Sequence, residues 1–196
     1  MVKYKIAISG KANAGKNTVA AMIANNLKFP RSKEKIVAVA DPMKSIIKQI
    51  FPEAKSEFLY GESKLRSEII DQKYKDVDGN TLTYRRALLD LGKFGRSYNT
   101  NTWLNLLVEE ANRSEDINTY IVSDCRFLSE FNYLKGAGFI MIRVLRDNGA
   151  KINDVSELEQ EQIPDSDFDY IIENNDTLQD LKNDIETLVV EIEFNR

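Results

Sequence analysis

The chain has 196 residues, a length that favours one domain with a core of its own. Its 42% hydrophobic and 30% charged residues, with a net charge of −4, argue against a disordered chain and against a nucleic-acid binder that relies on a basic surface. One cysteine, Cys125, excludes an internal disulfide and suits a reducing compartment such as the cytoplasm. The absence of histidine excludes Ser-His-Asp triads, Cys-His dyads and histidine-ligated zinc.

Strands and helices are predicted to alternate along the chain. Short apolar runs predict strands over Tyr4–Ser9, Lys35–Ala40, Asn118–Ser123, Phe139–Val144 and Tyr170–Ile172. Helical spacing and end signals predict helices over Asn17–Leu27, Pro42–Phe51 with Asp41 as N-cap, Thr83–Ser97, Trp103–Asn112, Leu128–Lys135 and Thr177–Glu191. The last helix is expected to bury a stripe formed by Leu178, Leu181, Ile185 and Leu188. Strands separated by helices imply a parallel sheet with helices on both faces.

Two polar stretches give few periodic signals. Residues 52–82 are the hardest part of the chain to interpret, and residues 146–166 form a polar loop that is a candidate lid. No linker or repeat divides the chain, and no apolar run reaches the ~18 residues of a membrane helix. We therefore predict a single domain over residues 1–196, with inserted substrate-binding or lid segments at about 52–97 and 146–166.

The segment GKANAGKNT, Gly10 to Thr18, follows a predicted strand and opens a predicted helix. This is the context that a phosphate-binding loop requires. Glycines let the backbone turn tightly enough to aim N–H groups at phosphate oxygens, and Lys16 adds a positive charge at the helix N-terminus. The alternative is an incidental glycine-rich turn between a strand and a helix.

An apolar strand that ends in a carboxylate, Tyr120 to Asp124, is the second motif. Beside a phosphate-binding loop such an acid holds Mg²⁺ directly or through water, although many strands end in Asp for reasons of turn formation. Arg126 and Glu130 follow closely and are expected to face the same cleft.

A set of cations in an acidic protein is the third feature: Arg85, Arg86, Lys93 and Arg96. A phosphate acceptor needs guanidinium groups that bind it and stabilise the transferring group. Gly92 and Gly95 lie in the same predicted helix, where each costs about 1 kcal/mol relative to alanine. We expect the close approach of a ligand or of another backbone to account for them. The alternative for the cations is a solvated basic face.

These residues resemble those of the phage-type deoxynucleoside monophosphate kinases, within the nucleoside monophosphate kinase group of P-loop enzymes. The matching segments span most of the chain and are ISGKANAGKNTVA (Ile8–Ala20), ADPMK (Ala40–Lys44), LYGESKLRSEII (Leu59–Ile70), TYRRALLDLGKFGR (Thr83–Arg96), IVSDCRFLSEFNYLKGAG (Ile121–Gly138) and DYIIENNDTLQDL (Asp169–Leu181). As in that group, a residue without a hydroxyl, Asn17, separates the loop lysine from Thr18. The resemblance implies a three-layer α/β P-loop NTPase fold with a five-stranded parallel sheet in the order 2-3-1-4-5.

The resemblance also implies the site residues. ATP phosphates and Mg²⁺ would be held by Gly10, Asn13, Ala14, Gly15, Lys16, Asn17 and Thr18, with Thr18 and Asp124 as metal ligands. The monophosphate would be bound by Asp41, Lys44, Arg66, Arg86, Arg96 and Glu130, and the phosphoryl transfer would depend on Lys16, Arg96, Asp124 and Arg126. The family has Asp where this chain has Asn17, which removes a charge near the phosphates. For Asp41 a helix N-cap, and for Lys44 a solvated first-turn lysine, remain the alternatives.

The predicted reaction is transfer of the γ-phosphoryl group of ATP to a deoxynucleoside monophosphate, with Mg²⁺ as cofactor. Such an acceptor is already anionic and needs no general base, which fits a chain without histidine. The alternatives are a dephospho-coenzyme A kinase-like enzyme with Asp41 or Asp124 as base, and a non-catalytic nucleotide-binding module, which Asn17 favours. We expect small-molecule partners, no nucleic acid or membrane and, from the resemblance, a homodimer in the cytoplasm, that of the host if the protein comes from a phage.

Overall fold

The computed structural model describes residues 3–27, 33–147 and 155–195. Contacts within the chain divide it into two compact units, residues 1–39 with 108–196 and residues 40–107. Helix α5 (Thr102–Arg113) contains the boundary between them. Whether the chain acts as one domain with inserted segments stays a prediction, and the two units are described separately below.

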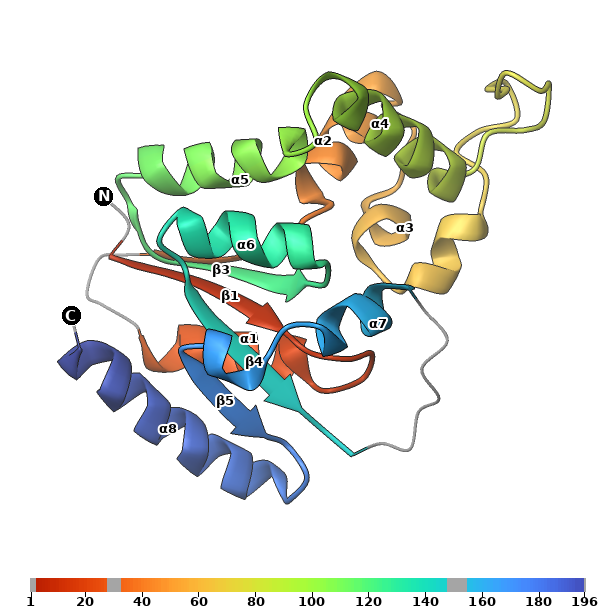
Figure 1. The fold of residues 1–196 in the computed structure, drawn as a ribbon. Helices are drawn as coiled ribbons and strands as arrows, with labels where there is room; N and C mark the ends of the chain where they lie inside the picture. Colours follow the sequence, from red (N-terminus) through yellow and green to blue (C-terminus); the bar gives the residue numbers. More distant parts are fainter. Residues whose placement is uncertain (1–2, 28–32, 148–154, 196) are drawn as a thin grey trace. The chain divides into compact units, whose positions relative to one another are not determined.

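The first unit is built on a five-stranded parallel sheet in the order β2-β3-β1-β4-β5. Its strands are β1 (Tyr4–Ser9), β2 (Lys33–Val37), β3 (Ile117–Cys125), β4 (Ile140–Leu145) and β5 (Tyr170–Glu173). Its helices are α1 (Lys16–Asn26), α6 (Leu128–Gly136), α7 (Val155–Glu161) and α8 (Leu178–Phe194). Figure 1 shows α1 and α8 on one face of the sheet and α6 on the other. The predicted strand order and the helices on both faces are confirmed.

Strand β4 shows how the sequence fills both faces of this sheet. Successive side chains of a strand point to opposite faces. Ile142 and Val144 join the core formed with α1 and α8, whereas Arg143 lies on the other face with its guanidinium over the Phe168 ring at 4.9 Å. Because both faces are covered, the strand is apolar almost throughout, as parallel strands of α/β proteins usually are.

The buried stripe of α8 was predicted with one error. Leu181, Ile185 and Leu188 are buried as expected, but Leu178 is 67% exposed. Leu178 is the first residue of the helix, directly after the Thr177 N-cap, so it precedes the part of the helix that covers the sheet. The stripe continues instead at the other end, with Val189 and Ile192.

The second unit contains short elements that the sequence pattern did not reveal. It comprises α2 (Asp41–Ile50), α3 (Ser56–Tyr60), the 3-10 helix η1 (Ser63–Ser67), α4 (Tyr84–Tyr98) and the first half of α5. Ile47, Leu59 and Tyr84 belong to its core, and the Lys55 N–H donates to the Tyr84 hydroxyl at 2.7 Å. Helices of five residues, such as α3, are too short for a repeating apolar pattern, which is why residues 52–82 gave few signals.

Side chains closely approach two glycines of α4, where the sequence analysis expected a ligand or another backbone. A Cβ on Gly95 would lie 2.4 Å from Cζ2 of Trp103, whose indole N–H donates to the Gly92 carbonyl at 3.2 Å. A Cβ on Gly92 would lie 3.3 Å from the Met43 sulfur and from a guanidinium nitrogen of Arg96. Both glycines therefore allow close packing against α4.

Other boundaries differ from the predictions. Strand β2 begins and ends earlier than expected, at Lys33 and Val37, and α2 has Ala40 as its N-cap with Asp41 as the first helical residue. The candidate lid contains α7 and the 3-10 helix η2 (Asp165–Asp167), while residues 148–154 of that segment lie outside the described residues. Within the described part of the chain, every helix is too short or too polar to cross a membrane.

Candidate active site

The predicted phosphate-binding loop connects β1 to α1 and depends on two glycines. Gly10 and Gly15 have φ angles of 151° and 98°, conformations that other residues rarely adopt. A Cβ on Gly10 would also lie 2.5 Å from the carbonyl oxygen of Val144. Gly15 is the N-cap of α1, so the loop runs directly into the N-terminus of a helix. Such a helix end presents unpaired N–H groups and positive charge to an anion.

Lys16 is the first residue of α1, and its side chain folds back over the loop. Its Nζ donates to the carbonyl oxygens of Gly10 at 2.6 Å and Lys11 at 2.7 Å. Asn17 and Thr18 follow with exposed side chains. The ammonium group is thus held by the loop that is expected to bind phosphates, and these phosphates would compete with the two carbonyls for it.

Asp124 lies near the carboxyl end of β3, at the edge of the sheet from which the loop starts. β1 and β3 are neighbours, with Ser9 paired with Cys125. The Asp124 carboxylate accepts a hydrogen bond of 2.7 Å from the N–H of Val39, which lies just after β2. This bond fixes the orientation of the carboxylate. Parallel strands bring their carboxyl ends to one edge, as the sequence analysis assumed.

The donor set suits Mg²⁺ that is bound together with a nucleotide. Within the described residues, no group of three or more Cys, Asp or Glu side chains gathers to form a metal site. Mg²⁺ in kinases is held by one or two protein oxygens, with phosphate oxygens and water completing its coordination. The hydroxyl of Thr18 and the carboxylate of Asp124 are two oxygen donors of the type that Mg²⁺ requires.

Glu130 stabilises the start of α6. Its Oε2 accepts hydrogen bonds from the backbone N–H groups of Arg126 at 2.8 Å and Phe127 at 3.2 Å. Burial raises the pKa of this carboxyl, and these two bonds oppose the shift. The geometry therefore gives Glu130 a structural role, and its predicted contact with a substrate stays a prediction. Arg126 itself has an exposed side chain.

Two consecutive asparagines after β5 were missed by sequence reasoning. The Asn174 side chain donates to the Ala14 carbonyl of the loop at 2.8 Å, and the Asn175 side chain accepts from the Asp147 N–H at 2.7 Å. A signal existed, because a pair of amides directly after a strand lies at the same edge of the sheet as the loop. This sequence signal alone was too weak to identify the two asparagines as site residues without the contacts that the structure shows.

A cavity of about 300 Å³ lies beside this pair of residues and the loop. It is lined by Lys11, Val144, Leu145, Arg146, Asp147, Glu173 and Asn175. Lys11 also forms an ion pair of 2.7 Å with Glu161, the last residue of α7. The end of α7 therefore contacts the loop directly.

In the second unit, Asp41 and Lys44 form a close ion pair in the first turn of α2. The Lys44 Nζ lies 2.6 Å from Asp41 Oδ1, and the Lys44 side chain is 6% exposed. Both structural alternatives are therefore wrong, because Asp41 is not the N-cap and Lys44 is not solvated. The Lys44 ammonium also lies 5.1 Å from the centre of the Tyr60 ring. Burial and the Asp41 charge raise the pKa of Tyr60, a residue that the sequence analysis had not selected.

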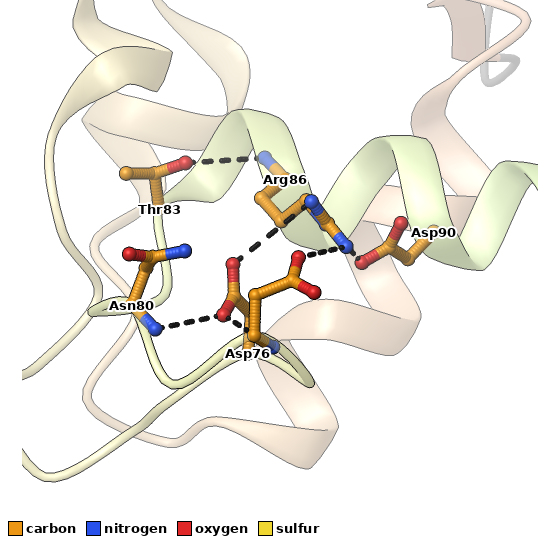
Figure 2. Close-up of polar contacts among 6 residues, drawn as sticks. Asp76, Asn80, Thr83, Arg86 and Asp90 are labelled. Atoms are coloured by element: carbon orange, nitrogen blue, oxygen red, sulfur yellow. Dashed lines mark hydrogen bonds and ion pairs between the residues drawn. The ribbon is translucent and has the colours of Figure 1, made fainter.

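Arg86, a predicted ligand of the monophosphate, is surrounded by three aspartates (Figure 2). Its Nε donates to Asp90 at 2.6 Å, and its two terminal nitrogens lie 3.4 Å from Asp78 and 3.9 Å from Asp76. An acceptor phosphate would have to compete with these carboxylates for the guanidinium. The role of Arg86 in substrate binding stays a prediction.

The turn that carries two of these aspartates is itself well ordered by hydrogen bonds. Asp76 Oδ1 accepts from the backbone N–H groups of Asp78 and Asn80 at 3.0 and 2.9 Å (Figure 2). Burial opposes ionisation of Asp76, but these bonds and the Arg86 charge outweigh it and lower its pKa below the ordinary value. Thr83 caps α4 by accepting from the Arg86 N–H at 3.2 Å. The turn thus anchors Arg86 at the start of α4.

Arg96 lies at the other end of α4 in a different setting. Its guanidinium covers Gly92 next to the Met43 sulfur, so it approaches the helix that carries the Asp41–Lys44 pair. Among the described residues no carboxylate forms an ion pair with it. Arg66, on η1, has a half-buried side chain. Lys44 on α2 and Arg96 on α4 are therefore two predicted ligands of the monophosphate that lie on neighbouring helices of the second unit.

Comparison with known proteins supports the kinase interpretation. The sequence profile of the family described as deoxynucleotide monophosphate kinase matches residues 92–185. Among solved structures, a dephospho-CoA kinase from Campylobacter jejuni is similar with a TM-score of 0.57 and 14% identity, over 100% of both chains. A sugar kinase from Janibacter sp. follows with a TM-score of 0.39 and 10% identity, over 95% of this chain and 98% of its own. No curated protein matches significantly. Residues 92–185 therefore carry the sequence pattern of the deoxynucleotide monophosphate kinases, which confirms the resemblance found in the sequence over that part of the chain. The fold of the chain is similar to that of a dephospho-CoA kinase.

Proposed function

We propose that this protein transfers the γ-phosphoryl group of ATP to the phosphate of a deoxynucleoside monophosphate. The observation that carries the proposal is a phosphate-binding loop closed by Lys16 in a chain that matches the deoxynucleotide monophosphate kinase profile over residues 92–185. The loop accounts for a nucleoside triphosphate donor, and the profile match accounts for the type of acceptor.

On the donor side, the loop and the start of α1 would bind the ATP phosphates through backbone N–H groups and Lys16. Thr18 and Asp124 would hold Mg²⁺, which neutralises charge on the phosphates during transfer. The cavity beside the loop, lined in part by Lys11, Arg146 and Asn175, is the candidate place for the rest of the donor nucleotide.

On the acceptor side, the cations of the second unit would bind the monophosphate. Lys44 is buried beside Asp41, and Arg96 has its guanidinium on the neighbouring helix α4. We propose the same role for Arg66 and Arg86, the latter by exchanging an aspartate for phosphate. The acceptor oxygen is already ionised, so positioning and charge neutralisation supply the catalysis and no side chain has to act as a base.

The two alternative functions are weaker. The likeness to a dephospho-CoA kinase, at 14% identity, concerns the fold, which kinases with different acceptors share. A module that binds ATP without turnover is suggested by Asn17, whose exposed amide follows Lys16 where an acidic residue was expected. The first alternative does not account for the profile match, and the second rests on Asn17 alone.

A coupled assay that detects ADP formation tests the proposal directly. The panel offers ATP and Mg²⁺ with each deoxynucleoside monophosphate, each ribonucleoside monophosphate and dephospho-coenzyme A. We expect turnover with one or more deoxynucleoside monophosphates. Turnover with dephospho-coenzyme A alone, or binding of ATP without turnover of any acceptor, would overturn the proposal in favour of the corresponding alternative.

Oligomeric state and location belong to the same proposal. We propose a homodimer that acts on small molecules in the cytoplasm, with the lone, buried Cys125 in keeping with a reducing compartment. Light scattering after size-exclusion chromatography measures the mass of the particle. A mass of about one chain, 22.4 kDa, at assay concentration would contradict the proposed homodimer.

A further inference from the structure

Asn174 joins the last strand of the sheet to the phosphate-binding loop. Its backbone N–H donates to the Leu145 carbonyl at 2.8 Å, which continues the pairing of β4 with β5 and fixes the position of Asn174. Its side-chain Nδ2 donates to the Ala14 carbonyl at 2.8 Å. Ala14 is fully buried and Asn174 is half-buried, so this contact is partly shielded from water.

The acceptor of this bond belongs to a peptide unit that is central to the loop. The Ala14 carbonyl and the Gly15 N–H lie in one rigid plane, and because the described chain has no cis peptide bond they point in opposite directions. Fixing the carbonyl therefore also fixes the direction of the Gly15 N–H. This N–H lies at the N-terminus of α1, where a phosphate is expected to bind.

Gly15 and Asn174 are also matched in shape. A Cβ on Gly15 would lie 2.4 Å from the Asn174 Nδ2, so a side chain at position 15 would displace the amide from its bond to Ala14. The φ angle of 98° at Gly15 independently favours glycine. The amide of Asn174 thus fills the space that a side chain at position 15 would occupy. It also holds the loop in a backbone conformation that is unfavourable for every residue except glycine.

We infer that Asn174 is a positioning residue for the phosphates of the donor nucleotide. It acts through the Ala14–Gly15 peptide plane and does not itself touch the phosphates. The inference rests on the proposed function in one respect, namely that the loop binds ATP, and it does not depend on the identity of the acceptor.

The test measures the affinity for a non-hydrolysable ATP analogue by calorimetry, in the presence of Mg²⁺. We expect Asn174→Ala to weaken binding about five- to tenfold, which corresponds to about 1–1.4 kcal/mol. In the kinase assay the KM for ATP should rise by a similar factor, with the KM for the acceptor unchanged. The matched control is Asn183→Ala, which removes an exposed asparagine of α8 and should leave all of these values unchanged.

A second variant separates positioning from simple loss of structure. Asn174→Asp keeps the shape, but its ionised carboxylate repels the Ala14 carbonyl, so binding should fall further than in Asn174→Ala. Partial burial and the facing carbonyl oxygen should raise the pKa of this new carboxyl above the ~3.9 of a free aspartic acid. When protonated, it can donate to that carbonyl, so the defect relative to the wild type should narrow as the pH is lowered from 8 to 5.5. If Asn174 served only the stability of the fold, the melting temperature of this variant would show the pH dependence, and the affinity of the folded protein for the analogue would not.

The outcomes distinguish this inference from the proposed function. Wild-type affinity for the analogue in both Asn174 variants would overturn the positioning role. Binding of the analogue by the wild type without turnover of any deoxynucleoside monophosphate would overturn the proposed function alone, because the calorimetric comparison still holds. A wild-type protein that does not bind the analogue would overturn both.

Discussion

The two units hold their predicted phosphate ligands in opposite ways. In the first unit, the loop is built from backbone: glycine conformations, peptide N–H groups and a lysine held by two carbonyls. In the second unit, the cations are held by side chains, as Lys44 is by Asp41 and Arg86 is by three aspartates. A backbone site exists before the ligand arrives. A site of ion pairs has to exchange partners, so its affinity depends on how strongly each cation is already engaged.

The largest effect is expected at the backbone site. Lys16→Ala should lower kcat/KM by at least about 100-fold, because it removes the charge that stabilises the transferring phosphoryl group. The fold should persist, since Lys16 contacts loop carbonyls and is not part of the apolar core. Steady-state kinetics beside far-UV circular dichroism measure both properties.

The matched control for this variant is Lys182→Ala, which removes an exposed lysine of α8. It should leave both the activity and the spectrum unchanged. Substantial activity in Lys16→Ala would mean that the loop is an incidental turn, and the contrast between the two units would disappear.

The next effect concerns the cations of the second unit. Arg96→Lys should raise the KM for the monophosphate about 10- to 150-fold, because lysine cannot present the planar fork that matches a phosphate, a difference of about 1.5–3 kcal/mol. Arg86→Lys should act in the same direction but less strongly, because aspartates already occupy its guanidinium. The KM for ATP should change little in both variants. Steady-state kinetics with each substrate varied in turn measure the two KM values. Equal KM values for the monophosphate in the wild type and both variants would mean that the two arginines do not bind the monophosphate and belong to a solvated face.

A third effect is confined to packing in the second unit. Gly95→Ala places a methyl group against the rigid Trp103 ring and should destabilise the fold by about 1–3 kcal/mol. Gly136→Ala, at the end of α6, meets nothing within 4 Å and should be neutral or slightly stabilising. Urea denaturation compares the two. Equal stabilities would show that the close contact between α4 and Trp103 relaxes without cost.

The same contrast explains how much could be predicted from the sequence. The strand order, the helices on both faces and the position of the loop follow from local patterns, such as the glycines around Lys16 and the apolar run before Asp124. The partners of the cations in the second unit follow only in part. Asp41 and Asp90 lie three and four residues from the cations that they pair with, whereas nothing local pairs Arg86 with Asp76, ten residues earlier. Asn174 was missed for the same reason, since it contacts a residue 160 positions away.

The two glycines of α4 are an instructive intermediate case. The sequence correctly marked Gly92 and Gly95 as positions of close approach, because glycine in a helix has a cost that something must offset. It could not identify what approaches. The answer, Trp103 and Met43, comes from tertiary packing of α4 against its neighbours in the second unit.

The smallest expected effect is a pH dependence of the second unit. Glu53 binds the Lys73 ammonium and accepts a hydrogen bond of 2.8 Å from the Tyr74 hydroxyl, and these contacts lower its pKa from 4.5 to about 2. A carboxyl whose pKa is lowered in the folded state stabilises the fold above its unfolded pKa, and loses this contribution as the pH falls toward the folded value. The contribution is therefore complete above pH 4.5 and declines from there toward pH 2.

Glu53→Gln removes this charge and keeps the shape of the side chain. We expect its melting temperature to lie slightly below that of the wild type at pH 7, by about 2 °C or less because exposed ion pairs contribute little. The difference should shrink as the pH is lowered from 5 to 3. Asp184→Asn, an exposed substitution on α8 in the first unit, serves as control and should show no such convergence. A difference in melting temperature that stays constant down to pH 3 would mean that the Glu53 charge does not contribute to the stability of the fold. The ion pair of Glu53 with Lys73 would then be held no more firmly than a solvated lysine of α8.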